Sequence, residues 1–384
     1  PAALALCGVT GRETFPDFST VVVDEHGVPT GELQEMSAMN LVRDRIPART
    51  PEQKRQAYVA NMKIWNALGL TGLHAMIGKP ELLDVVRDLE ASGDLSLRLR
   101  MPLWVEPEMT LDEMRAWLPL KNARGRRWTG GTAKFFIDGT IEGGTAWLIE
   151  PDTEGASHTP YWPDPAHYTA AVDLFAKGGF QCVTHAVGDM AVRHALNAYE
   201  AAGPVPNAMH RVEHIEVLQD EDLPRFAKLN VAASMQPLHM AMFDAGGHDE
   251  WSRRVGPERR KLAFRTQDLI GSGATLALGS DWGVAPYDPR LGMAWCRLRR
   301  TPGCPEKGPI EPRQALTGLQ TLSGYTTEAA RVLGDQSVAG KIKEGYRADL
   351  SAFAADLVET PPDDLLSVPT RLTVVDGEVM FQAE

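Results

Sequence analysis

The apolar positions of this chain fall into short runs that are separated by longer, helix-like patterns. From about residue 50 onward, short apolar runs alternate with segments of helical period. This alternation is typical of βα units arranged around a parallel sheet. We count seven runs, at 68–76, 95–105, 131–139, 180–187, 210–217, 230–237 and 274–282.

The segments between these runs carry apolar residues at intervals of three and four, which predicts amphipathic helices. The clearest examples are 51–68, 164–179 and 189–203. The first of these precedes the first visible strand, so we expect a further strand ahead of it. Seven strands with a leading helix are one short of a TIM-type (β/α)8 barrel, which is the α/β fold that we predict.

The two ends of the chain do not follow the βα pattern. Residues 19–35 predict a strand, a turn and a returning strand, and we interpret them as part of a small insertion. Residues 340–356 and 371–383 predict β segments with a tight hairpin at the letters VDGE, separated by the Pro/Asp-rich stretch 359–369.

Charge and composition exclude several classes of partner. The net charge is -12, from 39 Lys+Arg against 51 Asp+Glu, and no basic block interrupts it. We therefore expect neither a nucleic acid nor a membrane surface as partner. No apolar stretch is long enough for a transmembrane helix. The four cysteines show no CxxC spacing, which favours a reducing compartment and a cytoplasmic location.

Polar residues stand at the ends of the predicted strands, where the catalytic groups of a barrel lie. Taken singly, each has a structural interpretation, such as a hydrogen-bonded core histidine or a lysine that extends out of its strand. Taken together, four strands that each end in an acid-base or metal-binding group favour a functional site. The residues are His74, Lys134 with Asp138, His185, Glu213 with His214, Gln236 with His239, and Asp281.

Lys134 is the least expected of these residues, because its neighbours in AKFFI are apolar and a buried ammonium is costly. Its amine is a candidate nucleophile or Schiff-base former, and it is also a candidate for carboxylation into an anionic ligand. His185 and His214 lie 29 residues apart on consecutive predicted strands, a spacing that lets both imidazoles reach one Zn²⁺. Asp281 on the last strand suits a carboxylate that holds the metal and transfers a proton.

Other catalytic motifs are missing from the sequence. It contains no GxxxxGK[ST], GxGxxG, HExxH or GxSxG. With these readings removed, the chain resembles the amidohydrolase superfamily, in particular its family 3 branch, which includes N-substituted formamide deformylase. The likeness spans nearly the whole chain and is carried by KFFIDGTIEGGTAWLIEP, THAVGDMAV, HRVEHIEV, SMQPLH, LGSDWGV and GKIKEGYRADL.

The resemblance implies a metal-dependent TIM barrel with a small β-sandwich built from both chain ends and an insertion after strand one. It divides the chain into a partial insertion subdomain at 1–49, barrel strands two to eight at 50–335, and the C-terminal part of the β-sandwich at 336–384. It assigns the metal ligands Lys134, His185, His214 and Asp281, for one or two divalent ions, with Zn²⁺ the expected metal and Lys134 a candidate for carboxylation. His74, Arg211, Gln236, His239 and Trp282 are candidates for substrate contacts or for support of the ligands.

The family's His-x-His pair on strand one has no counterpart in this sequence. Two explanations stay open. An upstream segment outside this sequence supplies strand one and the pair, which we favour because the sheet otherwise has two exposed edges, or the chain is a natural truncation.

These observations lead to one leading function and two alternatives. The leading hypothesis is a hydrolase that uses a metal-activated water to cleave a C–N bond in an amide, formamide or cyclic amide, with Asp281 as the proton-transferring residue. The alternatives are a catalytically inert barrel with a binding or regulatory role, and a Schiff-base lyase that uses Lys134. The expected partner is a small-molecule substrate, and a homodimer is left open.

Overall fold

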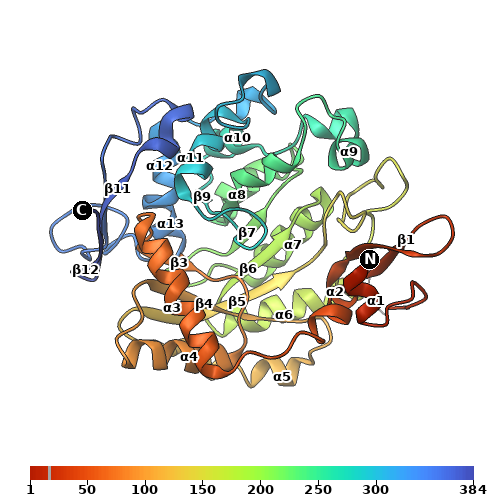
Figure 1. The fold of residues 1–384 in the computed structure, drawn as a ribbon, viewed down its shortest axis with the longest axis horizontal. Coiled ribbons are helices and arrows are strands. Elements are labelled where there is room, and N and C mark those ends of the chain that lie inside the picture. Colours follow the sequence, from red (N-terminus) through yellow and green to blue (C-terminus); the bar gives the residue numbers. More distant parts are fainter. Residues whose placement is uncertain (16–18) are drawn as a thin grey trace.

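The computed structural model describes residues 1–15 and 19–384, and its central feature is a curled sheet of seven parallel strands (Figure 1). The spatial order of the strands equals their order along the chain, so each strand is added beside the one before it. The strands are β3 (Gly72–His74), β4 (Arg98–Trp104), β5 (Trp128–Phe136), β6 (Gln181–Ala186), β7 (Arg211–His214), β8 (Ala232–Met235) and β9 (Leu276–Leu278).

All seven predicted strands are confirmed, and the sequence pattern places them well. Six lie inside their predicted runs, and β5 begins earlier than predicted, at Trp128. Strands β3 and β9 form the two edges of the sheet, and in the described part of the chain neither pairs with an eighth strand. The fold is therefore a curled parallel α/β sheet of the kind found in (β/α) barrels.

Helices cover the outer face of this sheet and follow the strands in the βα order (Figure 1). The three helices predicted at 51–68, 164–179 and 189–203 are confirmed as α3, α6 and α7. The helices of the barrel region are α3 (Pro51–Ala67), α4 (Pro80–Ala91), α5 (Leu111–Arg115), α6 (Pro165–Lys177), α7 (Asp189–Ala202), α8 (Leu223–Leu229), α9 (Glu250–Arg260), α10 (Thr266–Gly271), α11 (Pro289–Leu298), α12 (Gly318–Tyr325) and α13 (Thr327–Val332). Short 3-10 helices lie at Leu118–Asn122 (η1), Pro237–Met242 (η2), Pro305–Lys307 (η3), Pro312–Gln314 (η4) and Pro362–Ser367 (η5).

Strand β5 shows how one strand serves both the core and the cavity. Successive side chains of a strand point to opposite faces. Phe135 is fully buried and packs on the outer face against Tyr168 and Phe175 of α6. Lys134 and Phe136, on the opposite face, line the central cavity. The helices thus bury one face of β5, and the side chains on its other face line the cavity, where functional groups can lie.

Two small antiparallel sheets flank the barrel on opposite sides (Figure 1). Strands β1 (Thr20–Val23) and β2 (Pro29–Gln34) pair as the predicted hairpin, beside helices α1 (Ala2–Leu6) and α2 (Glu35–Arg43). At the other side β10 (Leu350–Phe353), β11 (Thr370–Val375) and β12 (Glu378–Gln382) form a three-stranded sheet. The predicted tight turn lies between β11 and β12, where Asp376 and Gly377 both have positive φ, as a two-residue type I′ turn requires.

Ion pairs connect the C-terminal sheet to the barrel. Arg98 of β4 donates from Nε to Asp349 Oδ2 at 2.7 Å and pairs with Asp376 at 3.2 Å. Helix α3 packs against β11 and β12. Among the described residues no helix is long and apolar enough to cross a membrane, and the four cysteines are free thiols.

The start of helix α3 offers a test of how the sequence sets this architecture. Thr50 forms a capping box with Gln53: its hydroxyl accepts the Gln53 N–H, and the Gln53 side chain accepts the Thr50 N–H. We predict that Thr50→Ala lowers the free energy of unfolding by about 1 kcal/mol, because an N-cap acceptor is lost. Chemical denaturation measures the change. Thr50→Ser keeps the hydroxyl and is expected to match wild type, and equal loss in both variants would contradict the capping role.

Candidate functional site

Lys134 and His185 lie on neighbouring strands and face the central cavity. Lys134 is 1% exposed, and its Nζ lies 4.5 Å from the centroid of the Phe136 ring. The same Phe136 ring stacks on the ring of His185, with ring centroids 4.7 Å apart. His185 Nε2 lies 3.1 Å from the Gly139 carbonyl oxygen, which can only accept, so Nε2 donates and Nδ1 is left as the basic nitrogen.

His214 and Asp281 occupy unusual backbone conformations. His214 ends β7 with φ 73°, and Asp281 follows β9 with φ 55°, both in the left-handed region that non-glycine residues seldom adopt. The ring centroids of His185 and His214 are 4.4 Å apart, so the two predicted histidine ligands are in contact. Strained backbone of this kind persists where surrounding contacts fix it, often at functional sites.

His239 joins this cluster from the 3-10 helix η2, which follows β8. Its ring lies nearly parallel to that of His214, with centroids 5.4 Å apart and an interplanar angle of 13°. His239 Nε2 lies 3.5 Å from Asp281 Oδ2. One ligand atom from each of His214, His239 and Asp281 falls within 4.8 Å of the others, a spacing that can hold a metal ion.

Burial keeps the predicted bases of the site unprotonated. Desolvation, with the neighbouring charges of His214 and Lys134, holds the pKa of His185 well below its usual value. Desolvation likewise lowers the pKa of His214 to about 3, against the opposing charge of Asp281. The pKa of Lys134 falls to about 8 because burial outweighs the charges of Glu213 and Asp281. Two neutral imidazoles and a readily deprotonated amine therefore share one pocket.

Asp281 and His239 show the opposite balance. Burial alone would raise the pKa of Asp281, but the nearby side chain of His239, together with His214 and Lys134, holds it well below its usual range. Burial alone would lower the pKa of His239, but the carboxylates of Asp281 and Glu216 beside its two ring nitrogens raise it to about 9. The carboxylate of Asp281 is therefore ionised, and it favours positively charged groups in this part of the site.

The residues predicted to contact substrate line the same cavity, but they differ in their contacts and in their exposure. Arg211 forms a buried ion pair with Glu213 at 2.5 Å, and Gln236 donates to the other oxygen of Glu213 at 3.0 Å. His74 has both ring nitrogens buried without a hydrogen-bond partner. Trp282 is 51% exposed, and its ring packs edge-on with the ring of Trp65, with ring centroids 5.1 Å apart.

The central cavity has a volume of about 1910 Å³ and passes along the inside of the curled sheet. Its lining includes His185, His214, Asp281 and Arg127. Lys134, His74, Arg211, Gln236, His239 and Trp282 also line it. Every residue predicted for the site therefore faces one continuous cavity.

Comparison with known proteins places this arrangement in a family. The family model described as "Amidohydrolase family" matches residues 1–381. The chain belongs to the amidohydrolase family. The similarity therefore extends over both small sheets as well as the barrel strands.

Relatives of this amidohydrolase match almost the whole chain but are longer than it. The putative amidohydrolase YtcJ of Bacillus subtilis is 28% identical over 99% of this chain and 71% of that protein. N-substituted formamide deformylase of Arthrobacter pascens is 24% identical over 99% of this chain and 70% of that protein. A solved structure, an uncharacterized metal-dependent hydrolase from Pyrococcus horikoshii, matches with a TM-score of 0.73 and 25% identity over 94% of this chain and 69% of that one.

Asp138 of the amidohydrolase has a role that its position at a strand end did not reveal. Its buried carboxylate accepts backbone N–H groups from Trp147 at 2.9 Å, Val187 at 3.0 Å and Gly188 at 2.8 Å. Burial raises its pKa to about 7 despite these three hydrogen bonds. Asp138 therefore fastens the long loop after β5 to the turn that follows His185. Asp189 adds a second tie, since its carboxylate accepts the Ile149 N–H at 2.8 Å.

Glu216 and Glu142 are further carboxylates near the site that the sequence reasoning missed. Glu216 lies on the segment after β7 and accepts the Trp251 indole N–H at 2.7 Å. Burial and the charge of Glu216 raise the pKa of Glu142 to about 7. Glu216 stands two positions after His214, an interval that places side chains on one face of a strand, but the positive φ of His214 and Ile215 breaks the strand there.

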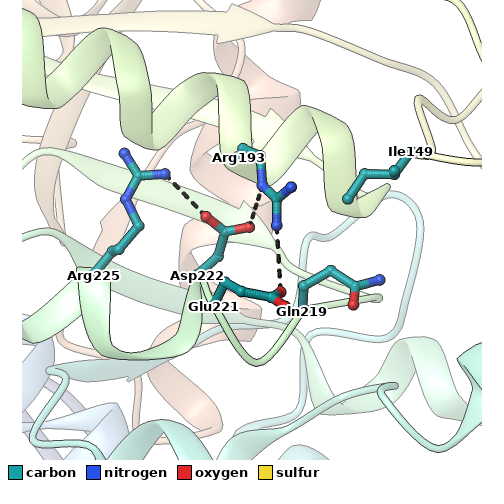
Figure 2. A pocket seen from close by; sticks show the side chains of 6 residues that line it. All are labelled: Ile149, Arg193, Gln219, Glu221, Asp222 and Arg225. Atoms are coloured by element: carbon teal, nitrogen blue, oxygen red, sulfur yellow. Dashed lines mark hydrogen bonds and ion pairs between the residues drawn. The ribbon is translucent and has the colours of Figure 1, made fainter.

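A second, smaller pocket lies outside the barrel and is a weaker candidate for a functional site. Its volume is about 520 Å³, and its lining residues are drawn in Figure 2. Arg193 contacts both Asp222 and Glu221, and Arg225 contacts Asp222 (Figure 2). These charges neutralise one another, so the central cavity is the stronger candidate for substrate.

The loop attached by Asp138 gives a test of the site's support. A Cβ on Gly188 would lie 2.2 Å from the Trp147 carbonyl oxygen, which belongs to the backbone. We predict that Gly188→Ala displaces the loop and destabilises the fold by about 1–3 kcal/mol, as overpacking does. Thermal and chemical denaturation measure the loss. Gly271→Ala is the matched control, because a Cβ there meets nothing within 4 Å, and similar destabilisation of both variants would refute the steric explanation.

Proposed function

We propose that this amidohydrolase is a metal-dependent hydrolase that cleaves a C–N bond in an amide, formamide or cyclic amide. The observation that carries the proposal is the convergence of Lys134, His185, His214 and Asp281, from four strands, on one cavity. Membership of the amidohydrolase family and the likeness to N-substituted formamide deformylase support it.

The chemistry of these residues suits a divalent metal, and we propose Zn²⁺. Imidazole nitrogens and carboxylate oxygens are ligands that Zn²⁺ prefers. His214 Nδ1 and His239 Nε2 are buried without a hydrogen-bond partner, which is costly unless something binds them. Of the predicted ligands, His214 and Asp281 belong to the group with metal-binding spacing, and Lys134 and His185 lie beside it. A second ion and carboxylation of Lys134 remain part of the proposal.

The protein's own groups would bind and orient the substrate and move a proton. A bound divalent ion would supply polarisation of a carbonyl oxygen and activation of a water molecule. Asp281, ionised and beside His239, is placed to accept a proton and to pass it to the leaving nitrogen. Arg211 and Gln236 fix Glu213 on the cavity wall, and His74 and Trp282 border the space that a small-molecule substrate would occupy.

The finer architecture is also proposed. We propose that residues 1–49 form an insertion after strand one and that residues 336–384 belong to a β-sandwich. Among the described residues nothing pairs with the outer edges of β3 and β9, which supports an eighth strand between them, on which we expect the His-x-His pair. Homodimer formation and a cytoplasmic location stay predictions.

Replacement of Asp281 tests the proposed chemistry. We predict that Asp281→Asn lowers kcat about 10²–10⁴-fold on a formamide or amide substrate, because the group that transfers the proton is lost. Steady-state kinetics and metal analysis of the full-length protein measure this. Asp112→Asn, at an exposed carboxylate on α5, is the control and is expected to keep full activity. A metal-free, folded and equally active Asp281→Asn protein would refute the proposal.

Lys134 permits a competing function, because a buried lysine whose pKa is lowered to about 8 suits Schiff-base chemistry. The hydrolase proposal predicts that borohydride, added with an aldehyde or ketone probe, leaves Lys134 unlabelled. Peptide mass spectrometry detects a reduced adduct. Stoichiometric labelling of Lys134 that Lys134→Met abolishes would favour the lyase instead.

A further inference from the structure

His239 is held at the site by contacts on both sides of its ring. It is 5% exposed and lies on η2, one turn beyond the end of β8. On one side its Nδ1 lies 3.6 Å from Glu216 Oε1. On the other side its Nε2 is directed toward Asp281, yet it is buried without a hydrogen-bond partner. The ring is therefore fixed in place, with one nitrogen left for a further bond.

Glu216 is itself fixed, which makes it suited to orient His239. It is 6% exposed, and its Oε2 accepts the Trp251 indole N–H at 2.7 Å. Trp251, on α9, is 2% exposed and packs against Phe243 and Phe264. A carboxylate that is locked by one donor and directed at the Nδ1 of a histidine selects the tautomer with the proton on Nδ1 and the lone pair on Nε2.

The lone pair on His239 Nε2 lies near two other possible metal ligands, His214 and Asp281. His214 Nδ1 is likewise buried without a partner, and the two imidazole rings are nearly parallel. Asp281 Oδ2 completes a set whose ligand atoms lie within 4.8 Å of one another. His185, by contrast, uses Nε2 on the Gly139 carbonyl and stands beside the set through its contact with His214.

We infer that His239 is a direct ligand of the metal, together with His214 and Asp281, and that Glu216 and Trp251 are positioning residues that hold its Nε2 toward the ion. This inference rests on the metal dependence proposed above and changes its ligand set. The family resemblance assigns the ligands to Lys134, His185, His214 and Asp281 and makes His239 a candidate for a substrate contact or for support of the ligands. Glu216 and Trp251 had no assigned part.

The test measures metal binding directly rather than activity. Full-length protein is stripped with a chelator and titrated with Co²⁺, and both the affinity and the visible absorption spectrum of the bound ion are recorded. The variant is His239→Asn, because the asparagine side-chain nitrogen can still lie beside Glu216 as Nδ1 does, whereas nothing replaces Nε2. Far-UV circular dichroism verifies the fold, and His239→Ala is the second variant should His239→Asn fail to fold.

We predict that His239→Asn weakens Co²⁺ binding by more than about 100-fold and changes the spectrum of any ion that still binds, since loss of a ligand exceeds the about 10–100-fold effect of losing an outer partner. Glu216→Gln is expected to weaken binding about 10-fold, and Trp251→Phe by less, because each loosens the orientation of the ring without removing a ligand. His194→Asn is the control, since this part-buried histidine on α7 contacts the Pro165 carbonyl, and it is expected to bind as wild type does.

The outcomes separate the two proposals. Wild-type protein that binds no Co²⁺ would overturn the proposed metal dependence. Wild-type protein that binds Co²⁺, with a folded His239→Asn or His239→Ala variant of the same affinity and spectrum, would overturn the assignment of His239 alone. Loss of binding in the His239 variants with no change in Glu216→Gln would overturn the positioning role of Glu216.

Discussion

The site of this amidohydrolase depends on one buried carboxylate, that of Asp138. A carboxylate with 1% exposure is stable only if its oxygens are satisfied, and three backbone N–H groups satisfy it here. Those donors come from the long loop after β5 and from the turn between β6 and α7. The same interaction therefore closes the end of β5, anchors the loop and fixes the turn that follows His185. Gly139, the next residue, then presents its carbonyl to His185 Nε2.

This constraint explains why the motif THAVGD has the residues it has. His185 takes its orientation from Gly139, and Gly188 lets the turn lie against the Trp147 backbone, where a side chain would not fit. Asp189 accepts the Ile149 N–H and so holds the loop a second time. The motif thus combines two roles: its histidine is a candidate metal ligand, and its Gly-Asp pair holds the loop after β5 in place.

Periodic patterns and strand ends were readable from the sequence, but contacts between distant segments were not. The seven strands, the helices α3, α6 and α7 and the Asp376-Gly377 turn follow from local patterns. The sequence could predict that Lys134, His185, His214 and Asp281 lie near one another, because parallel strands bring their carboxyl ends together, and all four line one cavity. Glu216 was missed because left-handed residues at 214 and 215 redirect the chain. Its partner Trp251 lies 35 positions away on α9, a separation that no local pattern in the sequence reveals.

His214 and Asp281 combine a left-handed backbone conformation with a place in the charged part of the site. His214 ends β7, and Asp281 lies three residues beyond the end of β9. Both have positive φ, and their side chains lie within reach of each other and of His239. Because Arg211 and Glu213 already compensate one another, the carboxylate of Asp281 is balanced by His239 and Lys134. A divalent ion that bound there would replace their protons, since ligands bind metals in their deprotonated forms, and proton release on binding would be the measurable sign of that exchange.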